Sequence, residues 1–79
     1  MTSDSEWEFC RGDIIVRIGE SDRWVVVDKF INPLNHYNKP MRNYYKVRKL
    51  SNNEPEQETM LFYNLDVNKK FVKVGKWNI

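Results

Sequence analysis

The stretch most able to bind a ligand is MRNYYKVRKL, at residues 41–50. It contains four basic side chains and two tyrosines and no acidic side chain. Alternate side chains share one face of an extended strand, so this spacing predicts a cationic face around an aromatic ring. Its members are Arg42, Tyr44, Lys46 and Arg48. Such a face can contact phosphates and stack a base, or anchor a protein interface. The alternative is a solvated strand face whose long side chains shield apolar surface.

Two further stretches are candidate binding sites. The segment NPLNHYNKP, at 32–40, has two prolines and three asparagines, which predicts a long loop. His36 and Tyr37 lie between the prolines and would form an exposed partner-binding tip, unless Tyr37 folds over the core in a plain connector. A second basic cluster near the C-terminus would add to the first if both lie on one side of the molecule. It comprises Lys69, Lys70, Lys73 and Lys76.

No spacing in the sequence predicts catalysis. It lacks the paired-histidine helix motif, the Gly-rich phosphate loop and the nucleophile elbow. Cys10 and His36 are the single cysteine and the single histidine, whereas a structural zinc ion needs four such ligands. We therefore expect no enzyme activity, no metal and no cofactor. The RGD tripeptide at 11–13 precedes a predicted strand, and we interpret it as coincidental.

The composition is that of one small domain. The 79 residues carry a net charge of +2, too small by itself to indicate a polyanion partner. We expect a single domain over 1–79, with a flexible N-terminal segment at 1–8 and a barrel at 9–76. The N-terminus lacks the pattern of a signal peptide, and the longest aliphatic runs are too short to span a bilayer. With a lone thiol, which suits a reducing compartment, these features predict a cytoplasmic location.

Alternation of apolar and polar residues predicts five short strands. We expect them at residues 13–19, 23–31, 41–50, 58–65 and 72–77. A polar turn is expected at 51–57, with Pro55 blocking strand pairing. A single helical turn, capped by Asn64 or Asp66, is expected before the last strand.

The predicted core takes largely one parity from each strand. Its members are Ile14, Val16, Ile18, Val25, Val27, Tyr45, Val47, Phe62, Val72 and Val74. The strand at 23–31 is apolar on both faces, which predicts a central strand or one covered on its second side. Trp7 and Trp77 are expected to pack together and tie both chain ends to the domain.

Two stretches carry a family resemblance. In CRGDIIVRIGESDRWVVVDKF, at 10–30, a Gly-Asp pair opens the first strand and a short turn leads to an apolar second strand. This arrangement resembles SH3-like and KOW-type small barrels, and also short accessory proteins of tailed bacteriophages. YNLDVNKKFVKVG, at 63–75, is similar to the helical turn and last strand that close such barrels. ESDR, at 20–23, stands in place of the glycine-rich KOW turn, so KOW-type RNA or ribosome binding is not carried over.

The resemblance implies a mostly β fold, a small, partly open antiparallel SH3-like barrel of about five strands with one helical turn before the last. For function, we expect a non-enzymatic binding module, a phage or mobile-element accessory protein that binds and modulates a host protein in the host cytoplasm. Two alternatives stay open. One is a small barrel that binds nucleic acid through the basic strand face, and the other is an oligomer that sequesters a nucleotide between subunits. Neither reading involves a membrane.

Overall fold

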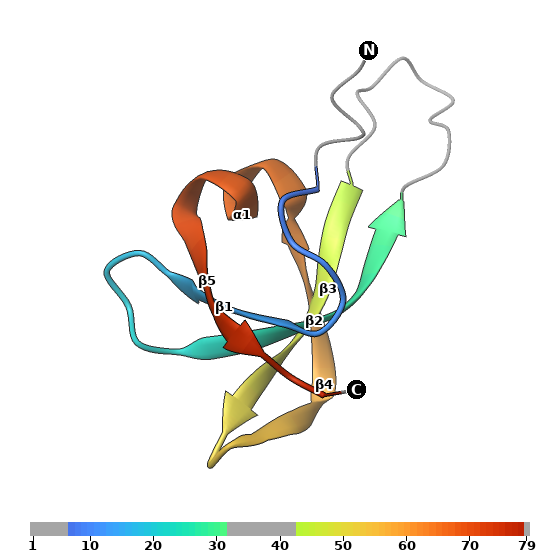
Figure 1. Ribbon diagram of the computed structural model, residues 1–79. Coiled ribbons are helices and arrows are strands. Elements are labelled where there is room, and N and C mark those ends of the chain that lie inside the picture. Colours follow the sequence, from blue (N-terminus) through green and yellow to red (C-terminus); the bar gives the residue numbers. More distant parts are fainter. Residues whose placement is uncertain (1–6, 32–42, 79) are drawn as a thin grey trace, which may run out of the picture.

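The computed structural model describes residues 7–31 and 43–78, which form a single open sheet and a helix. In chain order the elements are β1 (Asp13–Arg17), β2 (Arg23–Ile31), β3 (Asn43–Ser51), β4 (Glu54–Tyr63), α1 (Asn64–Lys70) and β5 (Phe71–Lys76). The strands pair antiparallel in the order β4-β3-β2-β1-β5 (Figure 1). The predicted mostly β class, with five strands and one short helix before the last, is confirmed.

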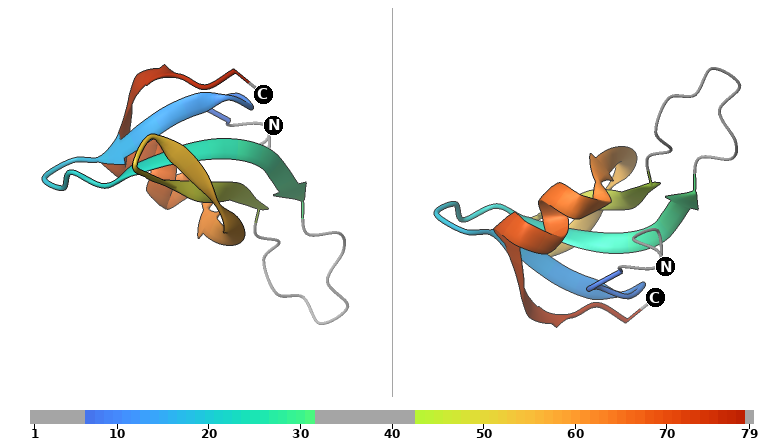
Figure 2. Two further views of the ribbon diagram at one scale, coloured as in Figure 1. Left: turned by 90° about the horizontal axis from the view of Figure 1, so that it is seen from below. Right: turned by 90° about the horizontal axis from the view of Figure 1, so that it is seen from above.

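The central strand β2 bends and thereby joins two parts of the sheet. Its pairing with β3 shifts between Val26 and Asp28, so Val27 is the extra residue of a β-bulge. A bulge bends its strand and increases the local twist. In Figure 1, β1 and the first part of β2 run across the view, while β3 and β4 run from top to bottom. Figure 2 shows β1 and β5 on one side of β2, with β3 and β4 on the other.

The main core lies on one face of this curved sheet, which we call the inner face. Ile15, Val26, Tyr45 and Val47 are fully buried there. Helix α1 and residues 7–9 cover these side chains, with contributions from the buried residues Phe9, Val67 and Phe71. In Figure 1, α1 sits at one end of the sheet, between β4 and β5.

The phenol of Tyr45 holds the cover of the inner face in place. Its hydroxyl accepts a hydrogen bond from the Phe9 amide at 3.2 Å and donates one to the side-chain oxygen of Asn68 at 2.7 Å. The Trp7 ring packs edge-on against the Tyr45 ring, with centroids 5.0 Å apart. Burial raises the pKa of Tyr45, although the hydrogen bond from Phe9 acts in the opposite direction. One tyrosine thus joins the N-terminal segment, β3 and α1.

Residues at the ends of the chain are attached differently from our expectation. We expected the segment 1–8 to be flexible. Its last two residues are instead held in place, because Trp7 packs on Tyr45 and the Glu8 amide donates a hydrogen bond to Oδ1 of Asn68 at 3.4 Å. Residues 1–6 lie outside the described part. Trp7 was also expected to pack on Trp77, but Tyr45 is its ring partner here. The Trp77 amide instead donates to the Gly12 carbonyl at 2.6 Å.

The predicted core is correct in the centre of the sheet and wrong at one side. Val25, Tyr45 and Val47 are fully buried, as expected. On β1 the parity is reversed, because Ile15 is the core residue, whereas Ile14 and Val16 are half-buried on the opposite face. The outward members of the predicted set are exposed large hydrophobics; these are Ile18, Val72 and Val74. Val27 and Phe62 are half-buried.

The burial of β2 confirms its central position. Val25 and Val26 are adjacent and point to opposite faces, yet both are 0% exposed. Parity alone could not place β1, since Ile14, Ile15 and Val16 are all aliphatic. Which of them enters the main core depends on α1 and the N-terminal segment, which lie on only one face of the sheet.

The turn before β4 is much tighter than predicted. Asn52 and Asn53 form it alone, with positive φ angles of 55° and 65°, as a two-residue hairpin loop of the favoured twist requires. Pro55 therefore lies inside β4, paired with Leu50. Proline is tolerated there because β4 is an edge strand whose outer side needs no ladder hydrogen bonds. The predicted helix cap is also wrong, since the N-cap residue is Tyr63 and no side chain caps the helix.

Candidate functional site

Opposite the main core, β2, β3 and β4 present a row of three aromatic rings. Tyr44 is paired with Phe30 on one side and with Tyr63 on the other. Directly paired residues of antiparallel strands point to the same face. The ring centroid of Tyr44 lies 6.3 Å from that of Phe30 and 6.1 Å from that of Tyr63. We call these three side chains the ring row and their side of β2–β4 the outer face.

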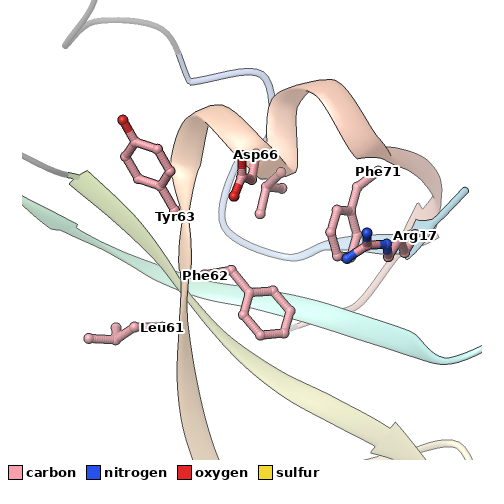
Figure 3. A pocket seen from close by; sticks show the side chains of 7 residues that line it. Arg17, Leu61, Phe62, Tyr63, Asp66 and Phe71 are labelled. Carbon is pink, nitrogen blue, oxygen red and sulfur yellow. The ribbon is translucent and has the colours of Figure 1, made fainter.

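The row next to the rings adds an aliphatic side chain and a pair of opposite charges. Lys46 is paired with Asp28 on β2 and with Leu61 on β4. Figure 3 shows Leu61 and Tyr63 on the same side of β4, with Phe62 projecting to the other side, toward the core. Phe30 is 41% exposed and Leu61 is 47% exposed. The outer face therefore exposes aromatic and aliphatic side chains to solvent. In the same row, the positive charge of Lys46 is balanced by the negative charge of Asp28.

A third row of the outer face ends in a small pocket. Arg48 is paired with Val25 and Thr59, and its side chain is half-buried. Together with Arg11 it lines a pocket of about 230 Å³, whose remaining walls are aliphatic. These walls are formed by Val25, Val27 and Pro55.

Sequence reasoning placed part of this face correctly and missed its aromatic character. Tyr44, Lys46 and Arg48 do share one face of β3. Arg42 and the loop residues His36 and Tyr37 lie outside the described residues. We expected Tyr44 to be the single ring on the cationic face, which is wrong, because Phe30 and Tyr63 flank it.

The missed ring on β2 has a local cause. In an unbroken strand Phe30 would share the parity of Val26, which faces the core. The bulge at Val27 inserts one residue and moves Phe30 to the outer face, opposite Tyr44. A run of three valines at 25–27 gives no sequence signal for the residue that bulges.

The second basic cluster does not extend the outer face of β2–β4. Lys73 and Lys76 lie on β5, at the opposite edge of the sheet from β4. Their ammonium nitrogens are 3.4 Å and 3.5 Å from Oδ1 of Asp13. Lys69 and Lys70 occupy the last turn of α1, where cations interact favourably with the helix dipole. Lys73 and Lys76 thus pair with Asp13, whereas Lys69 and Lys70 lie at the end of α1.

Asp13 is a buried structural anchor, although it belongs to the RGD tripeptide. Its side chain is only 4% exposed, and Oδ2 accepts a hydrogen bond from the Cys10 amide at 2.9 Å. Burial alone raises the pKa of this carboxyl, but the Cys10 hydrogen bond and the charges of Lys73 and Lys76 outweigh burial, so the pKa is lowered. This buried, paired carboxylate is not presented to a receptor.

The backbone at this turn requires glycine. Gly12 has a φ of 95°, a conformation that residues with a Cβ rarely adopt. Its amide donates to the Val26 carbonyl at 2.7 Å. The turn therefore connects the start of β1 to the central strand.

A second hollow lies between β4, α1 and the end of β1. It has a volume of about 230 Å³, and Figure 3 shows Arg17, Phe62, Asp66 and Phe71 around it. Arg17 pairs with Glu20 at 3.9 Å. Phe62 and Phe71 pack against each other with ring centroids 5.8 Å apart. The hollow combines an apolar floor with one acid, one base and the side chain of Tyr63, and its lining contains no cysteine, serine or histidine.

Neither a cluster of metal ligands nor a similar protein points to a function for the described residues. Among residues 7–31 and 43–78, no group of three or more His, Cys, Asp or Glu side chains is placed to hold a metal ion. Comparison with protein-family models, curated proteins and solved structures finds no match. The described part of the chain contains no helix able to cross a bilayer, since α1 has seven residues.

Proposed function

We propose that this chain is a non-enzymatic binding module that docks onto another protein through the outer face of β2–β4. One observation carries the proposal: the ring row stands beside the side chain of Leu61, and Phe30 and Leu61 are both more than 40% exposed on the outer face. Exposed apolar groups of this kind mark interaction sites. Aromatic residues and arginine are also the side chains that dominate binding energy at protein interfaces.

The charges near the ring row favour a protein over a nucleic acid. Lys46 is flanked by Asp28 on the neighbouring strand, and the lysines of β5 are engaged by Asp13. The net charge of the whole chain is only +2. A dedicated nucleic-acid domain normally concentrates a larger basic excess on its binding face.

A second candidate function, binding of single-stranded nucleic acid, gains support from the same three rings. Proteins that bind single strands combine stacking rings with basic side chains, and Tyr44 lies on the same face as Lys46 and Arg48. The two functions differ in salt dependence, because phosphate contacts are lost as salt rises.

The origin and effect of the protein belong to the same proposal. We infer an accessory protein of a phage or another mobile element, acting in the host cytoplasm by binding a host protein and altering its activity. The support is the resemblance of residues 10–30 and 63–75 to short phage-encoded barrels.

The test is affinity capture from a lysate of the bacterial host, with and without nuclease. The bait is the wild type or the ring-face variant Phe30→Ser/Leu61→Ser. A matched control is Val72→Ser/Val74→Ser, which removes two aliphatic side chains that are 45% and 54% exposed on β5. We expect a protein that survives nuclease, is retained by the control and is lost with the ring-face variant. Micromolar binding to an oligonucleotide at about 150 mM salt would favour the second candidate function.

A further inference from the structure

The pocket at the end of the outer face has an unusual lining. Two of its five lining residues are arginines, Arg11 and Arg48, and none is acidic. The other three lining residues, Val25, Val27 and Pro55, are aliphatic. Like charges that line one pocket repel each other, and an anion bound there would reduce this repulsion.

One donor of the Arg48 guanidinium lacks a hydrogen-bond partner among residues 7–31 and 43–78. Its Nε is buried and makes no hydrogen bond, whereas buried polar groups are nearly always satisfied. Its cross-strand neighbours, Val25 and Thr59, bring no charge. Within the described residues, neither Arg48 nor Arg11 takes part in an ion pair, although other basic residues have acidic partners.

The pocket and the ring row are close enough for one partner to contact both. Arg48 lies four residues after Tyr44 on the same face of β3. At about 3.3 Å per residue in a strand, the two positions are about 13 Å apart. Lys46 and Leu61 occupy the row between them.

We propose that this pocket receives a carboxylate side chain of the docked protein, so that the partner presents a glutamate or aspartate beside its contact with the ring row. Guanidinium groups bind carboxylates through charge-assisted, paired hydrogen bonds. The aliphatic walls contact the methylene groups of such a side chain, which a phosphate group would lack. A volume of about 230 Å³ is many times the roughly 10–15 Å³ that one water molecule requires on the same measure, so one such side chain fits.

This inference rests on the proposed function and names the chemistry of the partner. It is tested without the partner, by following the Nε–Hε signal of Arg48 by NMR during titration with the α-amide of N-acetylglutamate. We expect a saturable shift that is absent with the corresponding glutamine derivative. Arg48→Gln lacks this signal, so its binding is followed through the Nε–Hε signal of Arg11, the other arginine of the pocket, and should be abolished. Arg17→Gln, which removes an arginine already paired with Glu20, should leave the Arg48 response unchanged.

Three results would overturn the inference. They are no saturable shift, an equal response to the neutral glutamine derivative, or tighter binding of inorganic phosphate than of the carboxylate. Because this titration uses no partner protein, its failure is separate from failure of the docking proposal. Docking itself is judged by the ring-face variant, in which Arg11 and Arg48 are intact.

Discussion

The two faces of the sheet contain similar aromatic residues in opposite situations. On the inner face, the Tyr45 ring is fully buried and its hydroxyl is satisfied by Phe9 and Asn68. On the outer face, Tyr44 is the preceding residue in the chain, yet it is only half-buried, in the row between Phe30 and Tyr63. Helix α1 and the N-terminal segment make the difference, because they pack on the inner face. Burial thus assigns the inner face to stability, and the proposed binding surface is the part of the outer face around Phe30 and Leu61, which are exposed.

Aspartate substitutions should give the largest contrast between the faces. We expect Val26→Asp to abolish cooperative unfolding, because Val26 is 0% exposed and an unpaired buried charge costs several kcal/mol. A loss of more than about 4 kcal/mol would exceed what a marginally stable small domain tolerates. Leu61→Asp, on the outer face, should keep a cooperative thermal transition by circular dichroism. Equal melting of both variants would show that the assigned faces are wrong.

Asp13→Asn should produce the next largest effect, a loss of about 2 kcal/mol at neutral pH, because it removes a charged acceptor from a buried site. The folded-state pKa of Asp13 is lowered. Its contribution is therefore present above about pH 4, the unfolded-state value, and is lost as the pH falls through the folded-state pKa. Urea unfolding between neutral and acidic pH should show a smaller loss of stability in Asp13→Asn than in the wild type. Parallel pH profiles would contradict this role.

Tyr45→Phe should lower stability by about 1 kcal/mol, since the Phe9 amide and Asn68 lose a shared hydroxyl. Burial raises the pKa of Tyr45 above its ordinary value of 10.0. The wild type should accordingly lose stability as the pH rises through about 10, because the unfolded chain ionises there first. Tyr45→Phe should lose less stability than the wild type over that alkaline range.

The ring-face variant Phe30→Ser/Leu61→Ser should have the smallest effect on folding. Both side chains are more than 40% exposed, and substitutions at exposed sites usually change stability by less than about 0.5 kcal/mol each. Thermal melting should place this variant within a few degrees of the β5 control Val72→Ser/Val74→Ser. A large destabilisation confined to the ring-face variant would mean that these side chains support the fold.

Local patterns were sufficient to predict the elements but not their faces. The bounds of β2 agree with the prediction at both ends, because a run of β-branched residues between polar turns is a strong strand signal. The face of Phe30 depends on a one-residue bulge, and the core residue of β1 depends on where α1 packs. Both are set by tertiary contacts that no short stretch of sequence encodes.

The candidate site was predictable in the same partial way. Alternation along β3 was enough to group Tyr44, Lys46 and Arg48. Their neighbours Phe30, Tyr63 and Leu61 come from other strands, and the pairing register fixes which of them stand opposite. The pocket around Arg48 also depends on Pro55, which the sequence placed in a turn and the structure places in β4.

Direct binding of the purified captured protein tests the central claim, that the outer face is a protein-docking surface. The measurement is calorimetric titration at about 150 mM salt, where exposed charges are largely screened. Compared with the wild type, the ring-face variant Phe30→Ser/Leu61→Ser should bind at least tenfold more weakly, equivalent to about 1.4 kcal/mol, while Val72→Ser/Val74→Ser should bind with unchanged affinity. Equal affinity of the wild type and the ring-face variant would contradict the account.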